Sequence, residues 1–168
     1  MNPGNSIQNK ILTLSDAIKK VAQWRITGKT IAFTNGCFDI IHAGHISSLI
    51  EASSTANQLI VGLNSDKSPA CKKGVNRPIN DQNSRALVLE SLSMVDCVVI
   101  FDEPTPIDLI NAIKPDVLIK GGDYTIEQIV GAKEVISWGG KVVINNIVHG
   151  FSTTSIINKI QNPGDSDN

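Results

Sequence analysis

Two histidines, His42 and His45, lie three residues apart after an apolar stretch and a short polar turn. The turn covers residues 34–39, and Gly44 stands between the histidines, where its missing side chain leaves room for a ligand. A strand that leads through such a turn into a helix presents backbone N–H groups and the positive end of the helix dipole to an anion. Imidazoles add donors whose charge can change near neutral pH. The sequence therefore predicts a nucleotide phosphate site at this junction.

A packed histidine pair or half of a zinc site is the alternative explanation of His42 and His45. A zinc site would need further ligands, and His149 is the only other histidine in the chain. The cysteines Cys37, Cys71 and Cys97 are odd in number and show no C-x-x-C pair, which argues against a structural zinc site and against a disulfide framework.

Two other basic or glycine-rich segments could also contact a ligand. Residues 65–84 form a long polar stretch in which Lys73 and Arg77 could cover a triphosphate, or could simply be solvated. Residues 120–124 read Lys-Gly-Gly-Asp-Tyr and follow an apolar run. Asp123 could accept from a hydroxyl group there, although Gly-Gly-Asp is also an ordinary turn.

A fourth segment, residues 150–154, opens the last expected helix. Ser152, Thr153 and Thr154 have hydroxyl groups that cap a helix well and that, with the backbone amides, can bind a phosphate. An ordinary capped helix would show the same residues.

Alternating strand and helix patterns must position these segments. We expect strands at residues 30–33, 59–64, 95–101, 116–120 and 141–145, each short and rich in Val or Ile. We expect helices at residues 7–26 (with Ser15 as a possible cap), 45–56, 83–93, 106–113, 126–138 and 153–161. This alternation predicts a doubly wound α/β fold with a mostly parallel five-stranded sheet. Ligands bind such sheets at the carboxyl ends of the strands, where the strand order reverses.

Composition narrows the class of protein. The chain has 168 residues, 41% of them hydrophobic, and a net charge of −1, which gives no basic field to recruit nucleic acid. No apolar run has the length of a membrane span and the N-terminal residues are polar, so we expect a cytoplasmic protein. We expect a helical extension at residues 1–28, a single domain at 29–161 and a tail at 162–168.

The ordered motifs resemble one known family. Gly36-Cys37-Phe38-Asp39 followed by His42-Ala43-Gly44-His45 is similar to the signature of the cytidylyltransferase-like nucleotidyltransferases, and residues 33–45 resemble their ADP-heptose synthase branch. The resemblance continues through residues 73–78, 120–124 and 150–159. It implies a Rossmann-like nucleotidyltransferase fold. The chain differs from the family at His149, where an acidic residue is frequent, and at Lys159, where some relatives have arginine.

The resemblance also implies roles for particular residues. His42 would contact the triphosphate and His45 would donate to the α- or β-phosphate, so these two form the expected catalytic pair. The implied nucleotide-binding residues are Asn35, Gly36, Cys37, Phe38, His42, Gly44, His45, Lys73, Arg77, Gly150, Ser152, Thr153 and Thr154. Asp39, Lys120 and Asp123 are expected to bind the second substrate. Arg85 matches a family arginine but could equally form a structural ion pair. No metal ligand set is expected, and Mg²⁺ would arrive with ATP.

The reaction implied by the resemblance is transfer of AMP from ATP to D-glycero-β-D-manno-heptose 1-phosphate, giving ADP-heptose and pyrophosphate for lipopolysaccharide core synthesis. A sugar phosphate oxygen is already ionised at neutral pH, so positioning and charge neutralisation suffice without a strong base. A homodimer, and a separate kinase that supplies the sugar phosphate, are further expectations. The alternatives are a cytidylyltransferase for glycerol 3-phosphate, a pantetheine-phosphate type adenylyltransferase, or a nucleotide-binding module without turnover.

Overall fold

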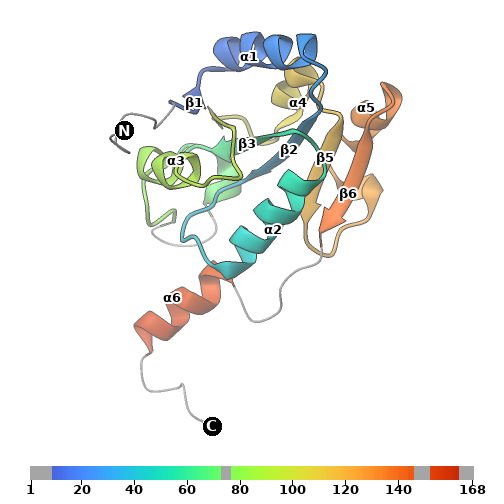
Figure 1. The fold of residues 1–168 in the computed structure, drawn as a ribbon. Helices are drawn as coiled ribbons and strands as arrows, with labels where there is room; N and C mark the ends of the chain where they lie inside the picture. Colours follow the sequence, from blue (N-terminus) through green and yellow to red (C-terminus); the bar gives the residue numbers. More distant parts are fainter. Residues whose placement is uncertain (1–8, 73–76, 146–151, 163–168) are drawn as a thin grey trace.

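Six parallel strands form the centre of the molecule in the computed structural model, which describes residues 9–72, 77–145 and 152–162 (Figure 1). The sheet has the order β1-β4-β3-β2-β5-β6, and every neighbouring pair is parallel. The strands are β1 (Ile11–Leu12), β2 (Ile31–Gly36), β3 (Gln58–Asn64), β4 (Cys97–Phe101), β5 (Val117–Gly121) and β6 (Lys141–Asn145). The predicted α/β class and parallel sheet are confirmed. The predicted number of five strands was wrong. The sixth strand, β1, has only two residues, which is too short to give an apolar run that the sequence analysis could detect.

The strand order reverses at β2, which lies between β3 and β5. Its pairing with β3 continues to Gly36 opposite Leu63, but its pairing with β5 ends at Phe33 opposite Leu118. The two strands therefore separate beyond Phe33, and the sheet opens at its carboxyl edge at the topological switch point where α/β folds bind ligands.

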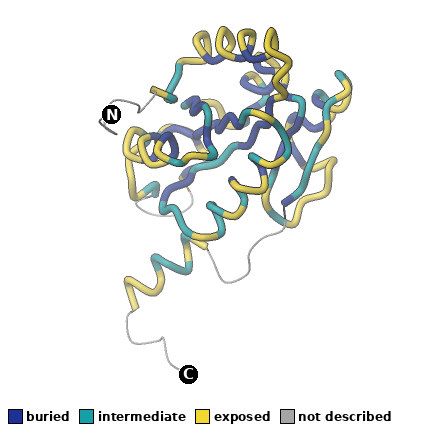
Figure 2. The backbone as a smooth tube through the Cα atoms, in the orientation of Figure 1, coloured by how far each residue is buried: buried dark blue, intermediate teal, exposed yellow. Residues whose placement is uncertain are grey.

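Helices cover both faces of the sheet (Figures 1 and 2). They are α1 (Leu14–Ile26), α2 (Ala43–Ser54), α3 (Gln82–Glu90), α4 (Ile107–Ile113), α5 (Ala132–Ser137) and α6 (Thr153–Gln161), with short 3₁₀ turns η2 (Pro69–Cys71) and η3 (Ile126–Gln128). One apolar core joins α1, α4 and α5 to the sheet, and the other joins α2 and α3 to its opposite face. Successive residues of a strand point to opposite faces of the sheet, so Phe33 packs in the first core and its neighbour Ala32 in the second.

Two predicted helices differ from the observed ones. The first begins only at Leu14, because β1 precedes it and Thr13, not Ser15, is its N-cap and accepts from the amide of Asp16. The helix predicted over residues 126–138 is divided into η3 and α5 by Gly131, which has a φ of 88°. A Cβ at this glycine would lie 2.5 Å from Cδ1 of Ile110, so the close packing on α4 also requires glycine.

The last helix, α6, extends away from the sheet and none of its residues is buried (Figures 1 and 2). Only its N-terminal end reaches the carboxyl edge of the sheet, where it borders the cavity described below. Each helix within the described ranges is too short or too polar to cross a lipid bilayer.

Candidate functional site

A cavity of about 680 Å³ lies at the carboxyl edge of the sheet, where β2 and β5 separate. Residues from five separate parts of the chain line it: the turn after β2 with the start of α2, the end of β3 and the segment after it, the segment after β4, the end of β5 and the segment after it, and the start of α6. Predicted site residues that line it are Asn35, Gly36, Cys37, Phe38, Asp39, His42, His45, Arg77, Lys120, Ser152, Thr153 and Thr154. Most of the predicted nucleotide-binding residues therefore border one common space, large enough for a small ligand.

The turn after β2 has a constrained backbone. Phe38 has a φ of 47°, in the left-handed region that residues with a side chain rarely adopt. A Cβ at Gly36 would lie 3.0 Å from Cε2 of the Phe38 ring, so the ring packs directly over this glycine. Strained backbone of this kind persists where the surroundings hold it and is common at binding sites. We call residues 35–39 the phosphate turn, after the phosphate that the sequence analysis expects there.

The two histidines lie together at the N-terminus of α2. Their rings stack with a centroid distance of 3.9 Å and an interplanar angle of 25°, and His42 is the N-cap residue. The Phe38 ring lies 5.3 Å from the His45 ring. Both histidines are half-buried and both line the cavity, so the rings are within reach of a ligand.

Burial controls the charge of this pair. Loss of solvation lowers the pKa of His45 to about 4, the nearby His42 acts in the same direction, and a backbone contact with Ile40 opposes both. Loss of solvation also lowers the pKa of His42. In the unliganded protein both imidazoles are therefore neutral at pH 7, and each carries one N–H that can donate to a phosphate oxygen. The sequence-based expectation of a charge change near neutral pH was wrong for His45, because composition does not reveal burial.

Asp39 joins the phosphate turn to the segment that precedes α3. Its buried carboxylate accepts from Nε of Arg77 at 3.0 Å and from the amides of Ile79 and Asn80 at 2.9 Å. The Asn80 side chain in turn donates to the Asp39 carbonyl at 2.7 Å. Three of these four donors bond to the Asp39 carboxylate and the fourth bonds to its carbonyl oxygen. In this arrangement Asp39 holds Arg77 at the cavity wall.

Arg85 on α3 is the largest fully buried side chain of the protein's described part. Its Nη1 donates to the carbonyls of Cys37 at 2.5 Å and Asn64 at 2.8 Å, and its Nη2 pairs with the Asp66 carboxylate at 2.6 Å. Arg85 thus links the phosphate turn to the end of β3 through hydrogen bonds to one carbonyl of each. The sequence left its role open because its burial depends on the packing of α3.

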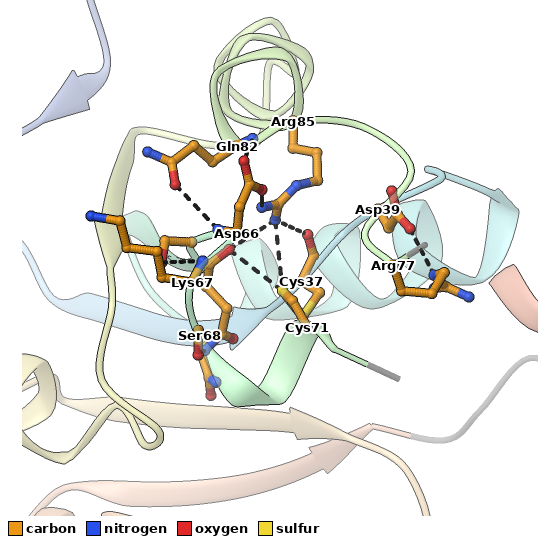
Figure 3. The surroundings of a disulfide bond; sticks show 12 residues. Cys37, Asp39, Asp66, Lys67, Ser68, Cys71, Arg77, Gln82 and Arg85 are labelled. Carbon is orange, nitrogen blue, oxygen red and sulfur yellow. Dashed lines mark hydrogen bonds and ion pairs between the residues drawn. A yellow bond between two sulfur atoms is a disulfide. The ribbon is translucent and has the colours of Figure 1, made fainter. Parts of the chain in front are cut away.

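Cys37 and Cys71 form a disulfide bond in the wall of the cavity (Figure 3). The prediction that the chain contains no disulfide was wrong. The two cysteines are 34 residues apart in sequence, but they follow the neighbouring strands β2 and β3, so the fold brings their Cα atoms to 5.5 Å. Cys97 is the remaining free cysteine and is buried in β4.

The other predicted residues are divided between the cavity and its surroundings. Nζ of Lys120 lies 3.5 Å from the Asn35 carbonyl on β2, which places the lysine across the opening of the sheet. Ser152 caps α6 by accepting from the Ser155 amide at 3.0 Å. Gly44 lies in the first turn of α2 but does not line the cavity, and Asp123 is exposed outside it. Lys73 and Gly150 fall outside the described residues.

Sequence reasoning missed several residues of the cavity wall. They are Asn64, Ala70, Cys71, Pro104, Thr105, Pro106, Gln128, Ile129 and Val130. Asn64 ends β3, the strand beside β2, so the rule that ligands bind at carboxyl strand ends could have found it. The others lie in connections whose approach to the cavity depends on the whole fold.

A parallel sheet that opens at its switch point, with two imidazoles at a helix start in the opening, defines a class of α/β protein whose site suits a nucleotide phosphate. The comparisons with known proteins agree with this class. The cytidylyltransferase-like family model matches residues 33–159, and the chain belongs to this family.

The chain is also similar to longer proteins. It is 51% identical over 152 residues to the bifunctional protein HldE of Methylobacillus flagellatus and 52% identical over 151 residues to HldE of Paramagnetospirillum magneticum. Each match covers 90% of this chain and 31% of the relative, so the chain spans about a third of their length.

A solved structure is similar as well. The lipopolysaccharide core biosynthesis protein from Thermoplasma volcanium matches with a TM-score of 0.57 and 28% identity, over 71% of this chain and 97% of that one.

Proposed function

We propose that this chain transfers AMP from ATP to D-glycero-β-D-manno-heptose 1-phosphate, forming ADP-heptose and releasing pyrophosphate. The observation that carries the proposal is the cavity in which the phosphate turn, the stacked His42–His45 pair and the start of α6 meet. The sugar substrate is supported by the ADP-heptose synthase motifs and by the similarity to HldE and to a lipopolysaccharide core biosynthesis protein. A cytidylyltransferase reaction is not favoured by these relatives.

In the proposed reaction a phosphate oxygen of the sugar attacks the α-phosphorus of ATP, and the bond to the β-phosphate bridging oxygen breaks. Negative charge grows on that bridging oxygen and on the non-bridging oxygens. Neutral His42 and His45 would each donate one N–H to these oxygens from fixed positions, and the backbone amides at the start of α2 would add their dipoles. Arg77, held by Asp39, and Lys120 would supply positive charge at the cavity wall.

Magnesium would enter with the nucleotide. No group of three or more His, Cys, Asp or Glu side chains converges on a common point within the described ranges. Mg²⁺ commonly keeps several waters and binds substrate phosphates, so its charge would neutralise the triphosphate without a dedicated protein cage. The residues described above would then position the phosphates.

The proposal is tested by measuring pyrophosphate release by the purified protein with ATP or CTP and with heptose 1-phosphate or glycerol 3-phosphate. We expect turnover with ATP and heptose 1-phosphate. His45→Ala should lower kcat by roughly 10²- to 10³-fold, the scale of one lost transition-state donor, while the KM for ATP changes less. Glu51→Gln, at an exposed position on the same helix, is the matched control and should leave turnover unchanged. Near-normal turnover of His45→Ala would remove His45 from the mechanism.

The proposal also includes a cellular location and an oligomeric state. Because ATP is the substrate, we place the reaction in the cytoplasm, and we propose a homodimer as the working form. Gel filtration coupled to light scattering of the purified chain tests the second point, and a monomeric mass at working concentration would contradict it.

A further inference from the structure

The disulfide between Cys37 and Cys71 occupies an unusual place in the molecule. Both cysteines line the cavity, and Cys37 belongs to the phosphate turn itself. The bond joins this turn to η2, the short turn that follows β3, and Ala70 next to Cys71 lines the same wall.

We propose that Cys37 and Cys71 form a reversible thiol–disulfide exchange site that sets the affinity of the cavity for ATP, an inference that rests on the proposed function. The chemical partner is a small thiol or disulfide of the glutathione class. Oxidation joins the two sulfur atoms and converts one molecule of oxidised glutathione into two of glutathione. Reduction by two thiols reverses this and returns two protein thiols and one small-molecule disulfide.

The surroundings of the bond suit exchange (Figure 3). Cys37 is the less buried partner and borders the cavity, which is the side from which a thiolate reagent would approach its sulfur. Attack there forms a mixed disulfide, and the electron pair of the broken bond passes to the sulfur of Cys71. Nη1 of Arg85 lies 3.9 Å from this sulfur, so its positive charge stabilises the departing thiolate. A second thiol then attacks the reagent's sulfur in the mixed disulfide, which forms the small-molecule disulfide and releases the Cys37 thiolate.

Contacts around the bond show what reduction would change. The carbonyl of Cys37 stays fixed by Arg85, whose other bonds do not depend on the disulfide. The amides of Cys71 and Lys72 instead bond only within their own turn, to the carbonyls of Ser68 and Pro69. Reduction removes the covalent link between η2 and the phosphate turn and leaves η2 held through Ser68, so we expect the η2 side of the wall to shift. A wall held in place binds a ligand at lower entropic cost, so the oxidised form should bind ATP more tightly.

Linkage makes the proposal measurable in two directions. If reduction weakens ATP binding by some factor, ATP must favour the disulfide over the dithiol by the same factor. ATP in the cavity also covers Cys37, so it should slow reduction by dithiothreitol.

The test compares protein equilibrated with oxidised glutathione and with dithiothreitol. Alkylation after denaturation, read by mass spectrometry, should find one free thiol in the oxidised protein, at Cys97, and three in the reduced protein. Calorimetry should show an ATP dissociation constant at least roughly fivefold higher after reduction. Cys71→Ser kept in dithiothreitol should match the reduced wild type, and Cys97→Ala is the control that should keep the full response.

A readout without nucleotide separates this proposal from the proposed function. Trypsin cleavage after the exposed Lys72 should become faster on reduction, whether or not the protein binds ATP. Three free thiols after exposure to oxidised glutathione, equal cleavage at Lys72 in both states, or an ATP affinity that is unchanged or higher after reduction would each overturn the exchange site. Absence of ATP binding in both states, with redox-dependent cleavage at Lys72, would instead overturn the proposed function and the control of affinity.

Discussion

Replacing His45 by glutamine tests the electrostatics of the histidine pair through protein stability. Burial lowers the pKa of His45 from the ordinary 6.5 to about 4, so the folded protein favours the neutral ring. In the unfolded chain the same ring takes up a proton near its ordinary pKa. The stabilising contribution of His45 is therefore fully present above pH 6.5 and is lost as the pH falls from 6.5 towards 4.

The size of the effect follows from these two values. At pH 5 an isolated group with this shift would cost the folded state about 2 kcal/mol relative to pH 7.5. The ring of His45 is only partly buried and faces an open cavity, so solvent screening reduces this figure, and we expect about 1 kcal/mol. The glutamine side chain introduced in the variant does not titrate, so the variant should not show the loss.

Urea unfolding of the two proteins at pH 7.5 and pH 5 provides the measurement. The free energy of unfolding of the wild type, relative to the His45→Gln variant, should fall by about 1 kcal/mol between the two pH values. All other titrating groups except His42 keep their surroundings in the variant, so their contributions cancel to first order. An identical pH dependence of the two proteins would show that His45 is not held neutral by burial, and the donor role described above would lose its basis.

Three further substitutions test the contacts that hold the cavity together, each by urea unfolding against the wild type. Asp39→Asn removes the charge that accepts from Arg77 and should lower the free energy of unfolding by about 2 kcal/mol while raising the KM for ATP; an unchanged KM would separate this contact from nucleotide binding. Arg85→Lys keeps a buried charge but cannot reproduce the planar set of bonds, and should cost about 3 kcal/mol; a loss below about 1 kcal/mol would contradict the anchoring role. Gly131→Ala places a Cβ against Ile110 at a positive φ and should cost about 2 kcal/mol, and a neutral effect would refute the packing argument.

Local signals in the sequence were sufficient for the part of the site around β2 and α2. A buried strand, a small turn and a helix start are contiguous in the chain, and their geometry follows from residue type and order. The strand positions were also found from apolar runs, with errors of a few residues at their ends. β1 escaped because two residues give no period to detect.

Features that depend on packing between distant segments were not accessible from the sequence. Nothing near Cys37 or Cys71 in the chain indicates their partnership, which arises because β2 and β3 are neighbours in the sheet. The burial of Arg85 and the low pKa of His45 have the same origin, since both depend on which side chains the fold places around them. Asp39 lines the cavity, but its bonds to residues 77–80 depend on the three-dimensional arrangement.

The cavity combines walls of unequal rigidity. Most of its wall comes from the ends of the central strands and the segments that follow them, whereas one part is the start of α6, a helix that buries none of its residues. Amide protons of α6 should consequently exchange with deuterium near the rate of an isolated helix, and occupancy of the cavity should slow them more than those of β2. Ordering this part of the wall when a ligand binds would cost free energy and so weaken the binding of the ligand. A weaker complex favours rapid dissociation of the product.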